Sequence, residues 1–182
     1  RSGSVLFLPV HQNDYQLGPI DAAVQLVEYG DFACRHCRAV YPVITQIKHW
    51  LGVHLCFVFR HFPASDNHLW AWQAAELAEA AGAQGQFWQM HRYLFEQPSE
   101  LWLDVLTVTN LTSLGLDPQQ LIQDIVQHRY QQQVQEDILS GLCSNVRQTP
   151  TFFINGVQYQ GVCRFDELME TIEAAGFEQE QR

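Results

Sequence analysis

Two short motifs constrain the fold of this chain most: a pair of cysteines after one apolar run and a Thr-Pro pair before another. The cysteines are the first and last of residues 34–37 and follow the run 24–30, while Thr149-Pro150 precedes the run 151–154. Cysteines at i and i+3 on the first turn of a helix have both sulfurs on one face, and the unpaired amides of the helix N-terminus favour a thiolate on the first. A proline that opens a strand is where a cis peptide bond can hold backbone groups beside that sulfur. Together the motifs predict thiol–disulfide exchange.

The residues around the cysteine pair favour this interpretation over its alternatives, a chance spacing or half of a zinc site. Residues 24–30 have the β-branched, apolar character of a buried strand, and residues 31–33 form a short connector. Apolar residues then recur at helical spacing up to Gly52, which ends the helix, and Pro42 inside it predicts a kink. The apolar face of this helix comprises Val40, Tyr41, Ile44, Ile47 and Leu51.

The rest of the chain predicts three more strands and six more helices. The expected strands are residues 53–60, ending at Phe62-Pro63, then 151–154 and 157–160, the last two joined by a type I′ turn at Asn155-Gly156. The expected helices run from His68 to the glycines at 82 and 85, from 87 to about 98, over 101–114, from 119 to about 128, from 131 to about 140, and over 165–174 with Gly176 as the stop.

Three local patterns support these helices. Phe87, Met90, His91, Leu94 and Phe95 recur at helical spacing. Asp117-Pro118 is a good N-cap followed by a first-turn proline. Val134, Ile138 and Leu142 mark the expected apolar face of the helix from 131. The order of elements is therefore β-α-β, a block of helices, then β-β-α.

Bulk composition excludes several classes of protein. A hydrophobic fraction of 47% is enough for a sizeable core, while a formal net charge of −10 argues against a nucleic-acid partner. No apolar stretch approaches the length of a membrane span. Residues 1–4 resemble a cloning remnant, so we expect either that a signal peptide was removed or that the native chain begins near Val5. The compartment, periplasmic or cytoplasmic, stays open.

The motifs resemble the bacterial DsbA-like branch of the thioredoxin superfamily, some members of which are fused to transporters. The resemblance covers residues 18–175 and is densest in 18–22, 26–32, 59–63, 84–88 with His91, and 149–156. It implies an α/β protein with the thioredoxin fold, β-α-β … β-β-α, and a helical insertion subdomain. The expected division is 1–17 as an N-terminal tag or arm, 18–63 with 144–176 as the thioredoxin-like domain, and 64–143 as the inserted helical subdomain.

The resemblance also implies the roles of individual residues. Cys34 is expected to be the exposed nucleophile and Cys37 its buried partner, with Pro150 as the facing cis-proline and Thr149 as the residue whose backbone pairs with substrate. Glu28, six residues before Cys34, matches the acidic residue beneath the motif. A carboxylate inside an apolar strand is costly without a task or a partner, and the task expected here is to relay a proton to or from Cys37. A purely structural buried acid is the alternative.

His36 lies between the two cysteines, where its side chain can carry a positive charge and donate a hydrogen bond to the Cys34 thiolate, lowering the pKa of that thiol. Stabilising the thiolate makes the oxidised pair a stronger oxidant. Arg35 stands where the most oxidising members have proline; it adds a cation but removes a rigid turn. Arg38 is expected to be a solvated helix residue.

The remaining cysteines and histidines have simpler interpretations. Cys56 is expected to be an inert buried thiol, and whether Cys143 and Cys163 form a second disulfide stays open. His61 and His68 could complete a zinc site with the cysteine pair only if the fold brought them together, so we expect no metal and no cofactor. Haem attachment is excluded because Arg38 stands where a histidine is required.

Two classes of function remain. The favoured one is a monomeric dithiol–disulfide oxidoreductase that acts on cysteine-containing proteins or peptides, with oxidation preferred to reduction or isomerisation and with an unidentified recycling partner. The alternative is a non-catalytic thioredoxin-like module that senses redox state or binds metal. Neither the substrate nor the direction of electron flow is encoded in a recognisable motif.

Overall fold

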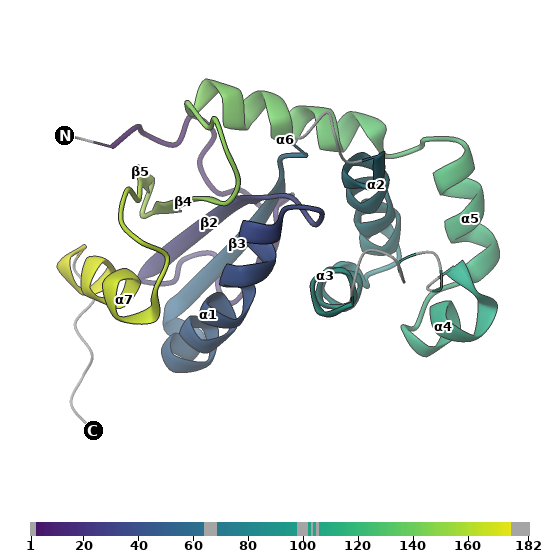
Figure 1. The fold of residues 1–182 in the computed structure, drawn as a ribbon, viewed down its shortest axis with the longest axis horizontal. Helices are drawn as coiled ribbons and strands as arrows, with labels where there is room; N and C mark the ends of the chain where they lie inside the picture. Colours follow the sequence, from purple (N-terminus) through teal and green to yellow (C-terminus); the bar gives the residue numbers. More distant parts are fainter. Residues whose placement is uncertain (1–2, 64–68, 98–101, 103, 105, 176–182) are drawn as a thin grey trace.

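A five-stranded sheet of order β1-β3-β2-β4-β5 forms the centre of the molecule (Figure 1). The computed structural model describes residues 3–63, 69–97, 102, 104 and 106–175. The central strands β2 and β3 run parallel, β4 runs antiparallel to β2, and β1 and β5 lie at the two edges. The strands are β1 Tyr15–Leu17, β2 Val24–Gly30, β3 Leu55–His61, β4 Thr151–Ile154 and β5 Val157–Gln158.

Helices cover both faces of this sheet. Helices α1 and α7 lie on one side, α6 runs along the other, and α2 to α5 gather at one end of the molecule (Figure 1). Their bounds are α1 Arg35–Leu51, α2 Leu69–Ala83, α3 Phe87–Glu96, α4 Val108–Ser113, α5 Pro118–Val126, α6 Gln131–Cys143 and α7 Phe165–Ala174, and a short 3₁₀ turn, Gly52–His54, follows α1.

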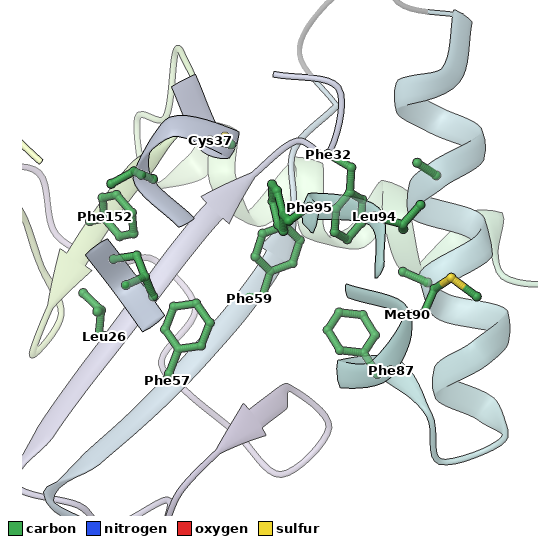
Figure 2. Packing of buried hydrophobic residues seen from close by; sticks show 14 of the residues in the cluster. Leu26, Phe32, Cys37, Phe57, Phe59, Phe87, Met90, Leu94, Phe95 and Phe152 are labelled. Carbon is green, nitrogen blue, oxygen red and sulfur yellow. The ribbon is translucent and has the colours of Figure 1, made fainter. Parts of the chain in front are cut away.

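The apolar run of β2 is buried on both faces, as expected of a strand with helices above and below it. Leu26 joins the larger core cluster with α1, α3 and α7, whereas Val27, one residue on, joins a second cluster on the opposite face. In the larger cluster, the rings of Phe32, Phe59 and Phe95 group between the sheet and α3 (Figure 2). This aromatic packing holds the loop after β2 against the helical insertion, with ring centroids 5.2 Å (Phe32 to Phe59) and 4.9 Å (Phe32 to Phe95) apart.

Several predicted elements are confirmed. The strand 24–30 and the helix 165–174 have the predicted bounds, and the five residues predicted to form the buried face of α3 are all buried. The carboxylate of Asp117 caps α5, accepting hydrogen bonds from the amides of Gln119 and Gln120 at 2.9 and 3.1 Å. Asn155 and Gly156 have φ angles of 47° and 82°, which is the positive-φ pair that a type I′ turn requires.

Other predictions need correction. The strand predicted from Val53 begins at Leu55, because a 3₁₀ turn comes first. In the helix predicted over 101–114, α4 covers Val108–Ser113 with Thr107 as its N-cap, and residues 102, 104 and 106 have 3₁₀ geometry. The helix from 119 ends at Val126, and α6 continues to Cys143 with Leu142 43% exposed rather than on its buried face. Residues 101, 103 and 105, together with His68 and Gly176, lie outside the described residues.

The N-terminal segment, predicted to be a tag or an arm, packs against the sheet from Ser4 onward. The carbonyl of Ser4 accepts a hydrogen bond from the amide of Gln158, and the amide of Leu6 donates to the carbonyl of Gly156. Leu6 is buried, and β1 pairs with β3 although the sequence did not indicate a strand there. Residues 1 and 2 lie outside the described residues. The division into a thioredoxin-like domain and an inserted subdomain stays a prediction.

Candidate active site

A tight turn after β2 places the first cysteine at the start of α1. The carboxylate of Asp31 accepts a hydrogen bond from the amide of Ala33 at 2.8 Å, and its carbonyl accepts one from the amide of Cys34 at 3.0 Å. Cys34 is then the N-cap residue of α1, with an extended backbone (φ −77°, ψ 120°) and a half-buried side chain. Its sulfur therefore lies beside the unpaired amides of the first helical turn.

The surroundings of Cys34 stabilise its thiolate and lower the pKa of the thiol to about 5. The largest cause is a hydrogen bond with the Cys37 thiol; partial burial opposes it, and the Thr149 side chain and the backbone amides of Cys37 and His36 add to it. In its neutral form the Cys34 thiol donates to the Thr149 carbonyl at 3.3 Å. That contact favours the thiol, but the donors around the sulfur outweigh it.

Cys37 has the opposite environment. It is fully buried in the larger core cluster, which also includes Phe152 of β4 (Figure 2). Burial raises the pKa of its thiol, and the neighbouring Cys34 and Glu28 raise it further. The amide of Asp31 lies 3.5 Å from its sulfur. One sulfur of the pair is thus reachable and readily ionised, and the other is enclosed and neutral.

The Thr149-Pro150 loop faces this pair from the start of β4. The peptide bond between Thr149 and Pro150 is cis, and the hydroxyl of Thr151 donates to the carbonyl of Gln148 at 2.7 Å, closing the loop. The loop brings the Thr149 carbonyl to Cys34 across 115 residues of sequence. The two motifs singled out in the sequence therefore meet in space.

Glu28 is buried on β2, as the sequence predicted. Burial raises the pKa of its carboxyl to about 8, Lys48 lowers it, and Cys34 raises it further. Lys48 lies on α1 and was missed by sequence reasoning, although it is the only lysine in the chain and adjoins Ile47 on the buried face of that helix. Its Nζ atom lies 5.2 Å from the ring centroid of Phe57 and 5.6 Å from that of Trp88.

His36 and Arg38 differ from their predicted environments. The imidazole of His36 is exposed and lies 3.4 Å from Nε of Arg35, whereas the group that His36 directs at the Cys34 sulfur is its backbone amide. Arg38 is not a solvated residue. Its guanidinium donates to the carbonyls of Phe95 and Gln97 at 2.7 Å each, which clamps α1 to the C-terminal end of α3.

The other cysteines and the predicted zinc ligands lie apart from the pair. Cys56 is buried as predicted, Cys143 is exposed at the end of α6, and Cys163 is half-buried; all are unpaired in the structure. The potential metal ligands grouped with His61 are Glu79 and Asp137 rather than a cysteine, within the residues that the structure describes. His68 lies outside those residues.

The sheet order, the cysteine pair at the start of α1 and the proline loop opposite it define a thioredoxin-like fold. The family model described as thioredoxin matches residues 11–174, so the chain belongs to the thioredoxin family. BdbD from Bacillus subtilis, a solved structure, is 25% identical, superposes with a TM-score of 0.78 and is covered over 98% of its length by 95% of this chain. The thiol-disulfide exchange protein α-DsbA2 from Wolbachia pipientis shares the fold, with a TM-score of 0.72 over 90% of this chain and 87% of its own at 19% identity.

Curated relatives include a protein named Na(+)/H(+) antiporter NhaA 1 from Mycolicibacterium vanbaalenii, 34% identical over 176 residues. The match takes in 94% of this chain but only 28% of that relative, so the chain spans about a quarter of the length of such proteins. None of the helices in the described part of this chain has the length and apolarity needed to cross a bilayer.

Proposed function

We propose that Cys34 and Cys37 form a redox pair that oxidises thiols of proteins or peptides to disulfides. The observation that carries this proposal is the contrast between the two sulfurs: Cys34 is half-exposed with its thiol pKa lowered to about 5, and Cys37 is enclosed with its thiol pKa raised. A pair with one low-pKa, accessible sulfur can form and release a mixed disulfide with a substrate.

The first step starts from the oxidised pair. A substrate thiolate attacks the Cys34 sulfur, a substrate–Cys34 disulfide forms, and the Cys34–Cys37 bond breaks with its electron pair on Cys37. The departing Cys37 sulfur needs a proton because it is enclosed. Glu28, whose carboxyl pKa of about 8 leaves it largely protonated at neutral pH, is the proposed donor, and Lys48 stabilises the carboxylate that remains.

The second step releases the product. A second substrate thiolate attacks the substrate sulfur of the mixed disulfide, which expels Cys34 as a thiolate. Two electrons have then passed from two substrate thiols to the protein. A thiol with a pKa of about 5 is roughly 99% ionised at pH 7, so Cys34 is a good leaving group. Because the same contacts stabilise the reduced protein, the oxidase direction is favoured.

The neighbouring residues receive supporting roles. The backbone of Thr149, held beside Cys34 by the loop at Pro150, is proposed to pair with an extended substrate segment. The exposed guanidinium of Arg35 places positive charge beside a sulfur that becomes anionic, and His36 directs its backbone amide at that sulfur. A separate redox protein must re-oxidise the pair, and we expect the chain to act as a monomer.

Two substitutions test the proposal. The oxidised protein should convert a reduced, unfolded protein with two cysteines to its disulfide form, and Cys34→Ser should abolish this. Cys37→Ser should accumulate a mixed disulfide between Cys34 and substrate, seen by mass spectrometry, while Cys143→Ser, at an exposed position, should behave as the parent protein. If Cys34 and Cys37 are alkylated equally slowly at pH 6 and no mixed disulfide forms, the chain is a non-catalytic module.

A further inference from the structure

Away from the cysteine pair, three elements bring a histidine and two carboxylates together. His61 ends β3, Glu79 lies on α2 and Asp137 lies on α6. His61 and Glu79 are 1% and 5% exposed, and Asp137 is partly exposed. One ligand-type atom from each residue lies within 4.8 Å of the other two. Ligands around a single divalent cation have such separations, because each lies about 2.0–2.6 Å from the metal.

The His61 ring has an unsatisfied polar atom in this cluster. Its Nε2 atom is buried and has no hydrogen-bond partner, although Oε1 of Glu79 lies only 3.0 Å away. A separation of 3.0 Å without hydrogen-bond geometry is what two ligands at right angles about 2.1 Å from one metal would show. Buried polar atoms are nearly always satisfied, so this one indicates a missing partner.

Each carboxylate is held in place by a hydrogen bond to one of its two oxygens. The hydroxyl of Tyr15 donates to Oε2 of Glu79 at 3.2 Å, and the backbone amide of His61 donates to Oδ2 of Asp137 at 2.7 Å. Such outer hydrogen bonds orient the ligands in metal sites.

The charge of the cluster also favours the binding of a cation. Two carboxylates this close repel each other, and burial removes the water that would screen them. Arg60, the preceding residue of β3, is already paired with Asp14 through two hydrogen bonds of 2.9 Å. A divalent cation would neutralise both carboxylates and satisfy the imidazole.

The cluster borders a cavity that can supply water and a route of entry. Glu79 and Asp137 line a cavity of about 450 Å³, together with Asp14, Tyr15 and Glu136. A cation held by three side chains needs further ligands, and waters in this polar cavity can provide them.

We propose that His61, Glu79 and Asp137 bind one divalent metal cation of the class that accepts mixed nitrogen and oxygen ligands, such as Mn²⁺ or Zn²⁺. The imidazole ligand disfavours Mg²⁺ and Ca²⁺, which prefer oxygen alone. The site joins β3 to α2 and α6, so the bound cation fastens the central sheet to the helical insertion. This site is independent of the thiol chemistry at Cys34.

Binding is tested with metal-free protein carrying Cys34→Ser and Cys37→Ser, so that the cysteine pair cannot take up metal. Mn²⁺ is the main probe because thiolates prefer softer ions. Titration calorimetry should show one Mn²⁺ per chain, and Mn²⁺ at 100 times its dissociation constant should raise the unfolding temperature by roughly 5–10 °C. Glu79→Gln and Asp137→Asn should each weaken binding at least tenfold, whereas Glu136→Gln, an exposed acid lining the same cavity, should not.

A measurement on protein with an intact cluster guards against variants that fail to fold. Bound Mn²⁺ should broaden the backbone NMR signals of His61 and Asp137 before those of residue 34. The proposal is overturned if no ion binds at one per chain, or if both carboxylate variants bind as the parent does. The proposal is also overturned if Ca²⁺ binds as tightly as Mn²⁺ and His61→Gln changes the affinity for neither ion, since the imidazole is then not a ligand.

Discussion

Replacing Glu28 by glutamine should make the reduced protein more stable above neutral pH while slowing thiol exchange. Burial raises the pKa of this carboxyl from 4.5 to about 8. Between these values the native protein retains a proton that the unfolded chain has lost, so the stability of the native protein falls as pH rises through this range. Glutamine does not titrate and removes this dependence.

The size of the effect follows from the same shift. Each pH unit of increase in this range lowers the free energy of unfolding by about 1.4 kcal/mol. Ionisation of Glu28 in the unfolded chain therefore destabilises the native protein by about 3 kcal/mol at pH 7 and about 4 kcal/mol at pH 8. At pH 5 the cost is below about 1 kcal/mol. The cost of burying an amide does not depend on pH, so the change in the stability difference between pH 5 and pH 8 isolates the carboxyl.

Urea unfolding of the reduced parent and of Glu28→Gln at both pH values measures this change. We expect the variant to gain about 3–4 kcal/mol relative to the parent between pH 5 and pH 8. Glu173→Gln, at an exposed position on α7, should show no such gain. Because the proton donor is lost, formation of the mixed disulfide at pH 7 should slow at least about tenfold. Parallel pH dependences in parent and variant would refute the burial argument.

Two further substitutions follow from contacts that the sequence did not indicate. Arg38→Met removes the guanidinium that binds the carbonyls at the end of α3, so it should lower the free energy of unfolding in urea by about 2–4 kcal/mol. Arg35→Met, at an exposed position on the same helix, should change that free energy by no more than about 0.5 kcal/mol. Equal effects of the two substitutions would show that the guanidinium of Arg38 does not hold α1 to α3. Lys48→Met removes the cation that lowers the pKa of Glu28, so the loss of stability with rising pH should extend above pH 8. An unchanged pH series would show that Lys48 does not act on Glu28.

Elements defined by local periodicity could be predicted from the sequence. Strand β2 and helix α3 have apolar patterns that their own residues specify, and the two motifs at Cys34 and Thr149 have characteristic neighbours. Strand β1 has only three residues and depends on pairing with β3, so no pattern within it indicates a strand. Within the helix predicted over 101–114, the α-helix of the described residues is Val108–Ser113, and apolar spacing alone does not locate its N-cap at Thr107.

The partners of charged side chains could not be predicted. Arg38 has the composition of an exposed helix residue, and the carbonyls that it binds lie 56 to 59 positions further along the chain. Lys48 carried a signal, since a lysine on a buried helix face requires a partner, but only the fold shows that Glu28 is near. His61, Glu79 and Asp137 likewise come from three separate elements.

The redox potential of the Cys34–Cys37 pair tests the central claim most directly. The protein is equilibrated with glutathione buffers, and each cysteine is alkylated and resolved by mass spectrometry. The stabilised Cys34 thiolate predicts a potential above about −200 mV, more oxidising than the glutathione pool. A potential near that of thioredoxin, about −270 mV, would contradict the oxidase direction and make the pair a reductant.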